Sequence, residues 1–448
     1  MPLFNWKAAQ RSSLWSTIRG AGVVMAIRVM GAGLAFVSQV FLARVMGTYE
    51  FGLYSYAFVL LTVLSVLAPF GTDWAVLRFI PEYAARKRWR RLEGVIRGSI
   101  AFVAVVSIVM ALAGAALIYV FSDRIGEHYV VPLYLALAGL PLFALFQIYV
   151  NFSRAFGWAA LAYTPQYILR PAFLMVLVLV LIVISVKTTA TAVLVASLVA
   201  SALAFAWQAL VLHRRKPHVA QPAAPAYHGR AWLTIAFSMA MFNGFQLIAT
   251  YGDVLILGNF VEPDKIGIYN AAVRAASIIN FVLMAMSATA TPKYAELYAR
   301  NQHDELNAYV THTARWIFWP SLAGAVVLVL AGRYILLAFG PAFVAGYPVL
   351  LILVLSNLVL AATGNVDSLL NMTGHQRVCA RIMVWSGIAF IALNFVLIPI
   401  FGVIGAALAV CLSLTLKFSW MVVVAKKRLG ILAVVTPSWP RLGRKAAA

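Results

Sequence analysis

Several charged and amide side chains lie inside stretches of sequence that are otherwise apolar. Arg28 is followed eleven residues later by Gln39, with Ala32 and Ala35 between them. In an α-helix, eleven residues return a side chain to within about 20° of the same face. An ionised side chain inside a membrane costs roughly 2.5–3.5 kcal/mol. Arg28 is therefore expected either to bind an anion such as a phosphate in a watery cavity, or to extend to the inner headgroups.

A second set of polar residues forms one stripe on a later apolar segment. Asn243, Gln246, Thr250 and Asp253 follow one another at spacings of three, four and three residues. This spacing places all four on the same face of a helix. Amide and hydroxyl groups on such a face are suited to hydrogen bonding the hydroxyls of a polar ligand.

The next apolar segment carries a comparable face, formed by Asn270, Arg274 and Ser277. Asp253 and Arg274 are separated from the middle of the connecting loop by similar numbers of residues, so at a rise of ~1.5 Å per residue they lie at similar depth. They are expected either to form a structural ion pair or to separate when an anion or a proton arrives. In the second case Arg274 binds the anion, and Asp253 is the protonatable switch.

Two further carboxylates lie near the predicted inner ends of helices. Asn357, Gly364, Asp367 and Asn371 recur at helical spacing, which indicates a face that lines an inner cavity. Asp73 precedes Arg78 and is expected to cap a helix or to pair with that arginine. The alternative for both Asp73 and Asp367 is a role in ion coupling or gating.

The overall composition is that of a membrane protein. Of 448 residues, 63% are hydrophobic and 11% are charged, the mean hydropathy is +0.91, and the formal net charge is +22. These values exclude a soluble enzyme, a disordered chain and a small disulfide-built module. They argue against a nucleic-acid binder, because the basic residues alternate with bilayer-length apolar runs. Cys379 and Cys411 form no redox or metal motif, so neither a metal nor another cofactor is expected.

The apolar runs predict twelve transmembrane helices. A spanning helix needs about 20 mainly apolar residues. Continuous apolar runs favour helices over the alternating pattern of barrel strands. The predicted spans are residues 21–43, 51–72, 97–121, 130–151, 166–186, 190–212, 232–258, 266–290, 314–338, 347–370, 378–399 and 403–425.

Basic residues indicate the orientation. Lysine and arginine concentrate in the connections on the same side as the N-terminus, most densely between residues 73 and 96. Cytoplasmic loops carry such an excess, so both termini are predicted to be cytoplasmic and the chain to lie in the inner (plasma) membrane. Much of the net charge follows from this topology and does not by itself indicate an anionic substrate. The basic tail is expected to contact lipids of the inner leaflet.

The two halves of the sequence carry one pattern. ARVMGTYEFGLYSYAF (43–58) resembles GNFVEPDKIGIYNAAV (258–273), which aligns Gly52 with Gly267, and IPEYAARKRWRRLE (80–93) resembles TPKYAELYARNQHD (291–304), which aligns Tyr83 with Tyr294. Six predicted spans separate the copies, so the halves are parallel repeats about an axis along the membrane normal. The predicted organisation is a cytoplasmic segment at 1–20, a six-helix half at 21–212, a linker at 213–231, a second six-helix half at 232–425 and a basic tail at 426–448.

With YILLAFGPAFVAGYPVLLIL (334–353) and LIPIFGVIGAALA (397–409), these phrases resemble a known family. The family that they resemble is that of the Wzx-type polysaccharide biosynthesis proteins. These are the oligosaccharide flippases of the multidrug/oligosaccharidyl-lipid/polysaccharide exporter superfamily. The resemblance runs from about residue 10 to 425. It implies a V-shaped, twelve-helix, alternating-access fold like that of the superfamily's MATE exporters. It also implies translocation of polyprenyl-diphosphate-linked glycans from the inner to the outer leaflet, and Asp253 matches a frequent acidic position of the family.

The expected function is therefore that of a lipid-linked oligosaccharide flippase and not an enzyme. The candidate site residues are Arg28 and Arg274 for the diphosphate, Gln39, Asn243, Gln246, Thr250 and Asn270 for the rest of the substrate, and Asp253, Asp367 and Asp73 for ion coupling or gating. The sequence contains no nucleotide-binding motif, so an ion or proton gradient is expected to drive transport. The expected partners are the glycan lipid, membrane lipids, and the polymerase and chain-length regulator of the same pathway.

Three alternatives remain open from the residues alone. A multidrug antiporter would favour an acidic cavity over one that contains arginines. A membrane glycan ligase or polymerase would favour a larger outer loop than any predicted here. A scaffold subunit of an export complex would have less need of buried charged faces.

Overall fold

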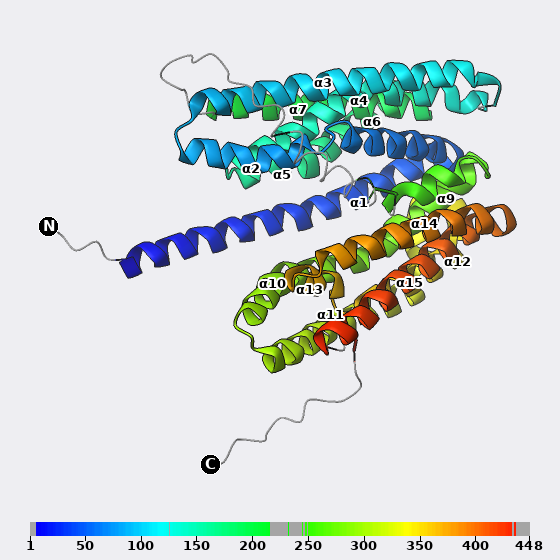
Figure 1. Cartoon of the computed structure of the whole chain (residues 1–448). Coiled ribbons are helices and arrows are strands. Elements are labelled where there is room, and N and C mark those ends of the chain that lie inside the picture. Colours follow the sequence, from blue (N-terminus) through cyan, green and yellow to red (C-terminus); the bar gives the residue numbers. More distant parts are fainter. Residues whose placement is uncertain are drawn as a thin grey trace, which may run out of the picture. The chain divides into compact units, whose positions relative to one another are not determined.

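A computed structural model describes residues 6–124, 126–215, 232, 244, 247–248, 250–431 and 434–435. All the regular structure in these residues is helical (Figure 1). Nine helical stretches within them are long and apolar enough to cross a membrane. This confirms the all-α, polytopic class that the continuous apolar runs predict.

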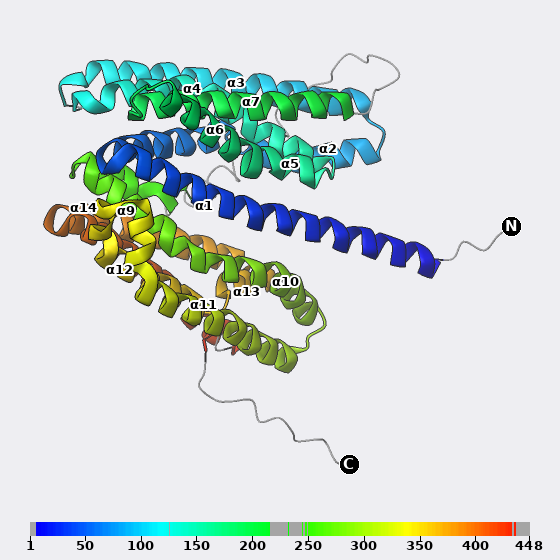
Figure 2. The same ribbon diagram turned by 180° about the vertical axis from the view of Figure 1, so that it is seen from behind.

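The chain divides into two compact units, and the first comprises Met1–Ala271 with Ala338–Ala342. Its elements are α1 (Trp6–Leu67), α2 (Thr72–Ala85), α3 (Trp89–Val120), η1 (Ser122–Arg124), α4 (Glu127–Ala155), α5 (Ala159–Thr164), η2 (Pro165–Leu169), α6 (Arg170–Val183) and α7 (Ala190–Arg215). Within this unit α3, α4 and α7 run side by side, as Figures 1 and 2 both show.

The second unit comprises Ala272–Leu337 with Phe343–Ala448. Helix α9 (Pro263–Ala276) begins in the first unit and ends in the second. The remaining elements are η3 (Ser277–Ile279), α10 (Asn280–Ala299), α11 (His303–Phe339), η4 (Pro341–Gly346), α12 (Tyr347–Ala362), α13 (Val366–Met372), α14 (Gln376–Phe401) and α15 (Val403–Leu429).

Three regions differ from the predicted spans in their form. The spans at 21–43 and 51–72 are joined in α1, which is interrupted at Gly47 (φ 76°, ψ 176°), a backbone conformation that essentially only glycine adopts. The span at 266–290 is divided among α9, η3 and α10. The span at 232–258 lies largely outside the described residues. The count of twelve and the boundaries of the two halves therefore stay predictions.

The glycines that repeat in the sequence meet in the structure. Gly52 on α1 and Gly267 on α9 pack backbone against backbone. A methyl group on Gly52 would overlap the carbonyl oxygen of Pro263, and a methyl group on Gly267 would overlap that of Thr48. Each carbonyl lies four residues before the glycine of its own helix, so the contact is reciprocal. Membrane helices use such small residues where their backbones approach closely.

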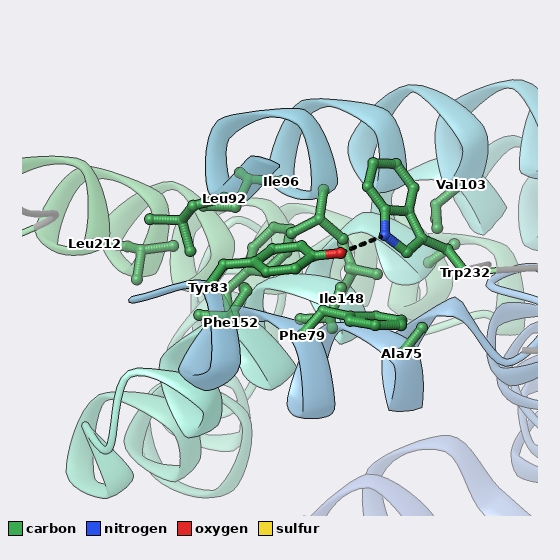
Figure 3. Close-up of a cluster of buried hydrophobic side chains, with 14 of the residues drawn as sticks. Ala75, Phe79, Tyr83, Leu92, Ile96, Val103, Ile148, Phe152, Leu212 and Trp232 are labelled. Atoms are coloured by element: carbon green, nitrogen blue, oxygen red, sulfur yellow. Dashed lines mark hydrogen bonds between the residues drawn. The ribbon is translucent and has the colours of Figure 1, made fainter. Parts of the chain in front are cut away.

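The repeated tyrosines each lie in the apolar core of one unit. In the first unit Tyr83 packs with Phe79 and Phe152, and its hydroxyl accepts a hydrogen bond from Trp232 Nε1 at 3.3 Å (Figure 3). In the second unit Tyr294 is fully buried among side chains of α10, α11, α13, α14 and α15. Residues aligned by the repeat thus have the same packing role in the two cores.

Helix α3 presents large apolar side chains outward. Val105 is 61% exposed and Leu112 is 66% exposed, seven residues apart and hence on one face. A continuous apolar face of this kind is stable in contact with lipid and would be an aggregation liability in water. The exposed face therefore agrees with a membrane-embedded chain.

Replacing Gly52 by alanine should destabilise the protein by about 2 kcal/mol, because the added methyl group meets a backbone carbonyl that cannot rotate away. A lower unfolding temperature of the detergent-solubilised protein would show this effect. Gly33→Ala on the same helix is the matched control, since nothing lies within 4 Å of the added Cβ there. Equal unfolding temperatures for the two variants would contradict the close contact.

Candidate substrate-binding site

Arg28 lies on α1 with its guanidinium over an aromatic ring. Its Cζ is 4.6 Å from the ring centroid of Tyr163. The side chain is half-buried, and its buried Nε has no hydrogen-bond partner among the described residues. Attraction to a ring face is worth about 0.5–2 kcal/mol and leaves the cation charged. The Arg28 guanidinium is therefore held within the first unit by a ring face.

A second arginine of this unit also stacks on aromatic rings. Arg170 begins α6, and its Cζ lies 5.0 Å from the ring centroid of Phe58 on α1 and 5.7 Å from that of Phe143 on α4. Sequence reasoning missed this residue because it falls at the inner edge of a predicted span, where a basic residue serves topology. The signal that could have found it is the helical spacing of Tyr163, Tyr167 and Arg170.

A π-helical turn lies between the two arginines. Residues Pro165–Leu169 form η2, a five-residue π-helix within the path from α5 to α6. It packs directly on α1, where a methyl group on Gly31 would reach Cβ of Tyr167 at 2.5 Å and its carbonyl oxygen at 2.9 Å. π-Helical turns re-aim the side chains that follow them and occur often at functional sites. This turn holds Tyr167 against α1.

We group these residues as a cation–aromatic row, defined as Arg28, Tyr163, Tyr167, Arg170, Phe58 and Phe143. It consists of two stacked clusters, which the continuous segment from Tyr163 to Arg170 connects. The rings of Tyr163 and Tyr167 are 6.0 Å apart, and those of Phe58 and Phe143 are 5.8 Å apart. Two cations next to aromatic faces suit a ligand that combines negative charge with less polar surfaces. Gln39 is half-buried on α1 as well, and its predicted role stays a prediction.

Asp253 has hydrogen-bond donors from its own unit. The hydroxyl of Tyr269 on α9 donates to Oδ2 at 2.5 Å, and the backbone N–H of Val254 donates to Oδ1 at 2.8 Å. Asp253 is 6% exposed and Tyr269 is fully buried. Sequence reasoning considered only Arg274 as a partner, although Tyr269 is the residue that the repeat aligns with Tyr54. Arg274 belongs to the second unit, and its pairing with Asp253 stays a prediction.

The other polar residues predicted on the stripe and on the face of the next segment differ in how exposed they are. Asn243 and Gln246 lie outside the described residues. Thr250 is exposed. Asn270 is buried, and its amide donates to a carbonyl of its own helix at 3.4 Å. Arg274 is half-buried near the end of α9.

In the second unit Asp367 lies on α13, just after a break in the helical path. Gly364 and Asn365 have φ values of 54° and 66°, which separates α13 from α12. The half-buried carboxylate of Asp367 interacts electrostatically with the ammonium group of Lys417 on α15. Broken helices in transporters frequently adjoin binding sites, so the predicted role of Asp367 in coupling or gating stays a prediction.

Asp73 lies in the first turn of α2, outside the predicted spans. Its Oδ1 is buried without a hydrogen-bond partner among the described residues, and burial raises the pKa of its carboxyl to about 6. The expected ion pair with Arg78 does not form: the Arg78 guanidinium lies over the ring of Phe79 at 5.8 Å. The positive charge of Arg154 partly offsets the effect of burial on this pKa.

Solved structures show which class of protein has this fold. The chain is similar to an inward-facing multidrug resistance MATE transporter, with a TM-score of 0.74 and 12% identity over 91% of this chain and 98% of the other. It is also similar to the lipid II flippase MurJ, with a TM-score of 0.69 and 14% identity over 90% of this chain and 87% of the other. This chain therefore shares the fold of these two solved structures.

Residues 17–297 match the family model described as polysaccharide biosynthesis protein, and the chain belongs to this family. A relative from Methanocaldococcus jannaschii, the uncharacterized membrane protein MJ1068, is 23% identical over 406 residues, which cover 85% of this chain and 78% of that protein.

Two relatives from Haloferax volcanii match part of the chain. The probable flippase AglR is 32% identical over 37% of this chain and 35% of its own length. The probable low-salt glycan biosynthesis flippase Agl15 is 24% identical over 40% of this chain and 39% of its own length. The chain thus aligns with less than half of either protein.

Replacing Tyr269 by phenylalanine should destabilise the protein by about 1–3 kcal/mol, because a buried carboxylate loses its hydroxyl donor. The measurement is the unfolding temperature in detergent. Tyr129→Phe is the matched control, since the buried Tyr129 hydroxyl has no partner among the described residues and its removal should cost little. A Tyr269→Phe protein as stable as this control would show that the hydrogen bond contributes nothing.

The raised pKa of Asp73 should make stability depend on pH. In the folded protein the Asp73 carboxyl keeps its proton up to about pH 6, whereas in the unfolded chain it loses the proton near pH 3.8. The corresponding stabilisation is present below the unfolded pKa and is lost as the pH rises through 6. Asp73→Asn should therefore be more stable than the wild type at pH 8, by about 2 kcal/mol, and similar at low pH. Unfolding temperatures at both pH values test this, with the exposed Asp123→Asn as control.

Proposed function

We propose that this protein is a flippase that moves a polyprenyl-diphosphate-linked oligosaccharide from the cytoplasmic to the outer leaflet of the inner membrane. Membership of the polysaccharide biosynthesis protein family supports a role in glycan production. The names of AglR and Agl15 support flipping as the step. The fold shared with a lipid II flippase supports a lipid-linked substrate.

One observation carries the proposal: Arg28 lies within an apolar helix and stacks on an aromatic ring, with no carboxylate partner among the residues that the structure describes. In a medium of low dielectric constant a cation without a counter-ion attracts anions strongly. A diphosphate offers two charged groups, and guanidinium groups bind phosphate oxygens through paired N–H donors. Arg170 adds a second positive charge to the same row.

The remaining predicted contacts complete the proposal. Arg274 is a further cation for the substrate, and Gln39, Asn270 and the stripe that contains Thr250 hydrogen bond its polar groups. The polyprenyl chain stays in the bilayer. An ion or proton gradient drives transport through Asp253, Asp367 and Asp73, whose carboxylates change charge on protonation or cation binding.

A multidrug antiporter is the principal rival, because the MATE transporters share the fold. The substrates of such an exporter are often cationic or aromatic, and a cation would be repelled by Arg28 and Arg170. The charges of the row therefore favour an anionic substrate.

Arg28→Ala should trap lipid-linked repeat units on the cytoplasmic face, with export falling about tenfold or more, since a charge-assisted bond to phosphate is worth about 1.5–3 kcal/mol. The assay expresses the variant in a strain that lacks the gene and labels surface glycan with an impermeant reagent. Arg28→Lys should retain part of the activity because it keeps the charge.

Arg333→Ala is the matched control, because this exposed arginine also stacks on a ring, 5.1 Å from the centroid of Tyr347, but lies outside the row. It should export normally. Normal export by Arg28→Ala would remove Arg28 from the substrate path. Units that reach the outer face of the deletion strain but remain unjoined would replace the flippase with a ligase or polymerase.

A further inference from the structure

Two tyrosines of the cation–aromatic row have a geometry that the binding of a diphosphate does not explain. The rings of Tyr163 and Tyr167 stand at 65° to each other, and both side chains are half-buried. Neither hydroxyl has a hydrogen-bond partner in the part of the chain that the structure describes. Part of each ring surface is therefore accessible to a ligand.

The local backbone holds this pair in place. Tyr163 lies in the last turn of α5, just before the π-helical turn, and Tyr167 lies within that turn. The contact between Tyr167 and Gly31 presses the backbone of η2 onto α1, the helix that carries Arg28. The rings are therefore attached to a rigid junction, which limits the entropy lost when a ligand binds.

We infer that Tyr163 and Tyr167 form a stacking subsite for the first sugar ring attached to the diphosphate, an inference that rests on the proposed flippase function. The C–H face of a pyranose carries partial positive charge, and the face of an aromatic ring carries partial negative charge. The two surfaces attract each other and exclude water. Two hydroxyls without partners can donate to and accept from the hydroxyls of the sugar.

The position of Arg28 relates this subsite to the diphosphate. The guanidinium of Arg28 occupies one face of Tyr163 at 4.6 Å. The first sugar is bonded directly to the terminal phosphate, so a phosphate held by Arg28 brings that sugar to the neighbouring ring, Tyr167. A polar sugar inside a membrane protein needs hydrogen-bond partners to offset its desolvation, and this part of the row supplies them.

The test compares two probes that differ only by the sugar: a polyprenyl diphosphate, and the same lipid with one N-acetylhexosamine. Affinities are measured with purified protein in nanodiscs. The wild type should bind the glycosylated lipid more tightly. Tyr167→Ala, which leaves the Tyr163 ring against Arg28 in place, should lose about three- to tenfold in affinity for the glycosylated lipid, the scale of an aromatic contact, and little for the bare diphosphate. Tyr167→Phe keeps the ring and should retain most of the difference.

The controls separate this inference from the proposed function. Tyr119 lies on α3 and is 78% exposed, and the Tyr119→Ala control should bind both probes as the wild type does. Arg28→Ala should weaken both probes alike, because both contain the diphosphate. Equal loss of both probes in Tyr167→Ala would overturn the sugar subsite and assign this ring to packing or to the prenyl chain. Failure of the wild type to bind either probe would overturn the flippase proposal itself.

Discussion

The reciprocal contact of Gly52 with Gly267 positions helix α9, which carries Tyr269 and Arg274, beside α1. It lets the backbones of α1 and α9 touch, with the carbonyl of one helix against the glycine of the other. The rotation and height of α9 beside α1 follow from this contact, because an added Cβ on either side would force the helices apart. Tyr269 follows Gly267 by two residues and reaches Asp253. Arg274 lies two turns further along the same helix.

Three charged groups of the first unit, Arg28, Arg170 and Asp253, have aromatic residues as neighbours. Arg28 rests on the face of a tyrosine and Arg170 on the faces of two phenylalanines, whereas Asp253 accepts a hydrogen bond from the edge of a tyrosine. The negative face of a ring attracts cations and the phenolic hydroxyl donates to anions, so neutral aromatic residues can hold either sign. A ring face attracts a guanidinium without contributing a negative charge of its own to the site.

The hydropathy of the chain predicted most helices, because a run of apolar residues in lipid can only satisfy its backbone as a helix. It did not predict that η2 is a π-helix or that α9 and α10 are separated by a 3₁₀ turn, since these depend on packing against other helices. Arg28 could be predicted as a site residue because its charge contrasts with its neighbours. Arg170 could not, because basic residues at the ends of spans are common for topological reasons.

The sequence by itself determined the membrane class, the apolar runs, the repeated Gly-Tyr phrases and the polar residues placed among apolar ones. These properties depend on composition and on spacing along the chain. Only the tertiary structure decided that Asp253 hydrogen bonds to Tyr269 and that Arg28 and Arg170 join one aromatic row. The physical reason is that spacing restricts a side chain to one face of its own helix, whereas its partner depends on how the neighbouring helix is rotated and how closely it approaches.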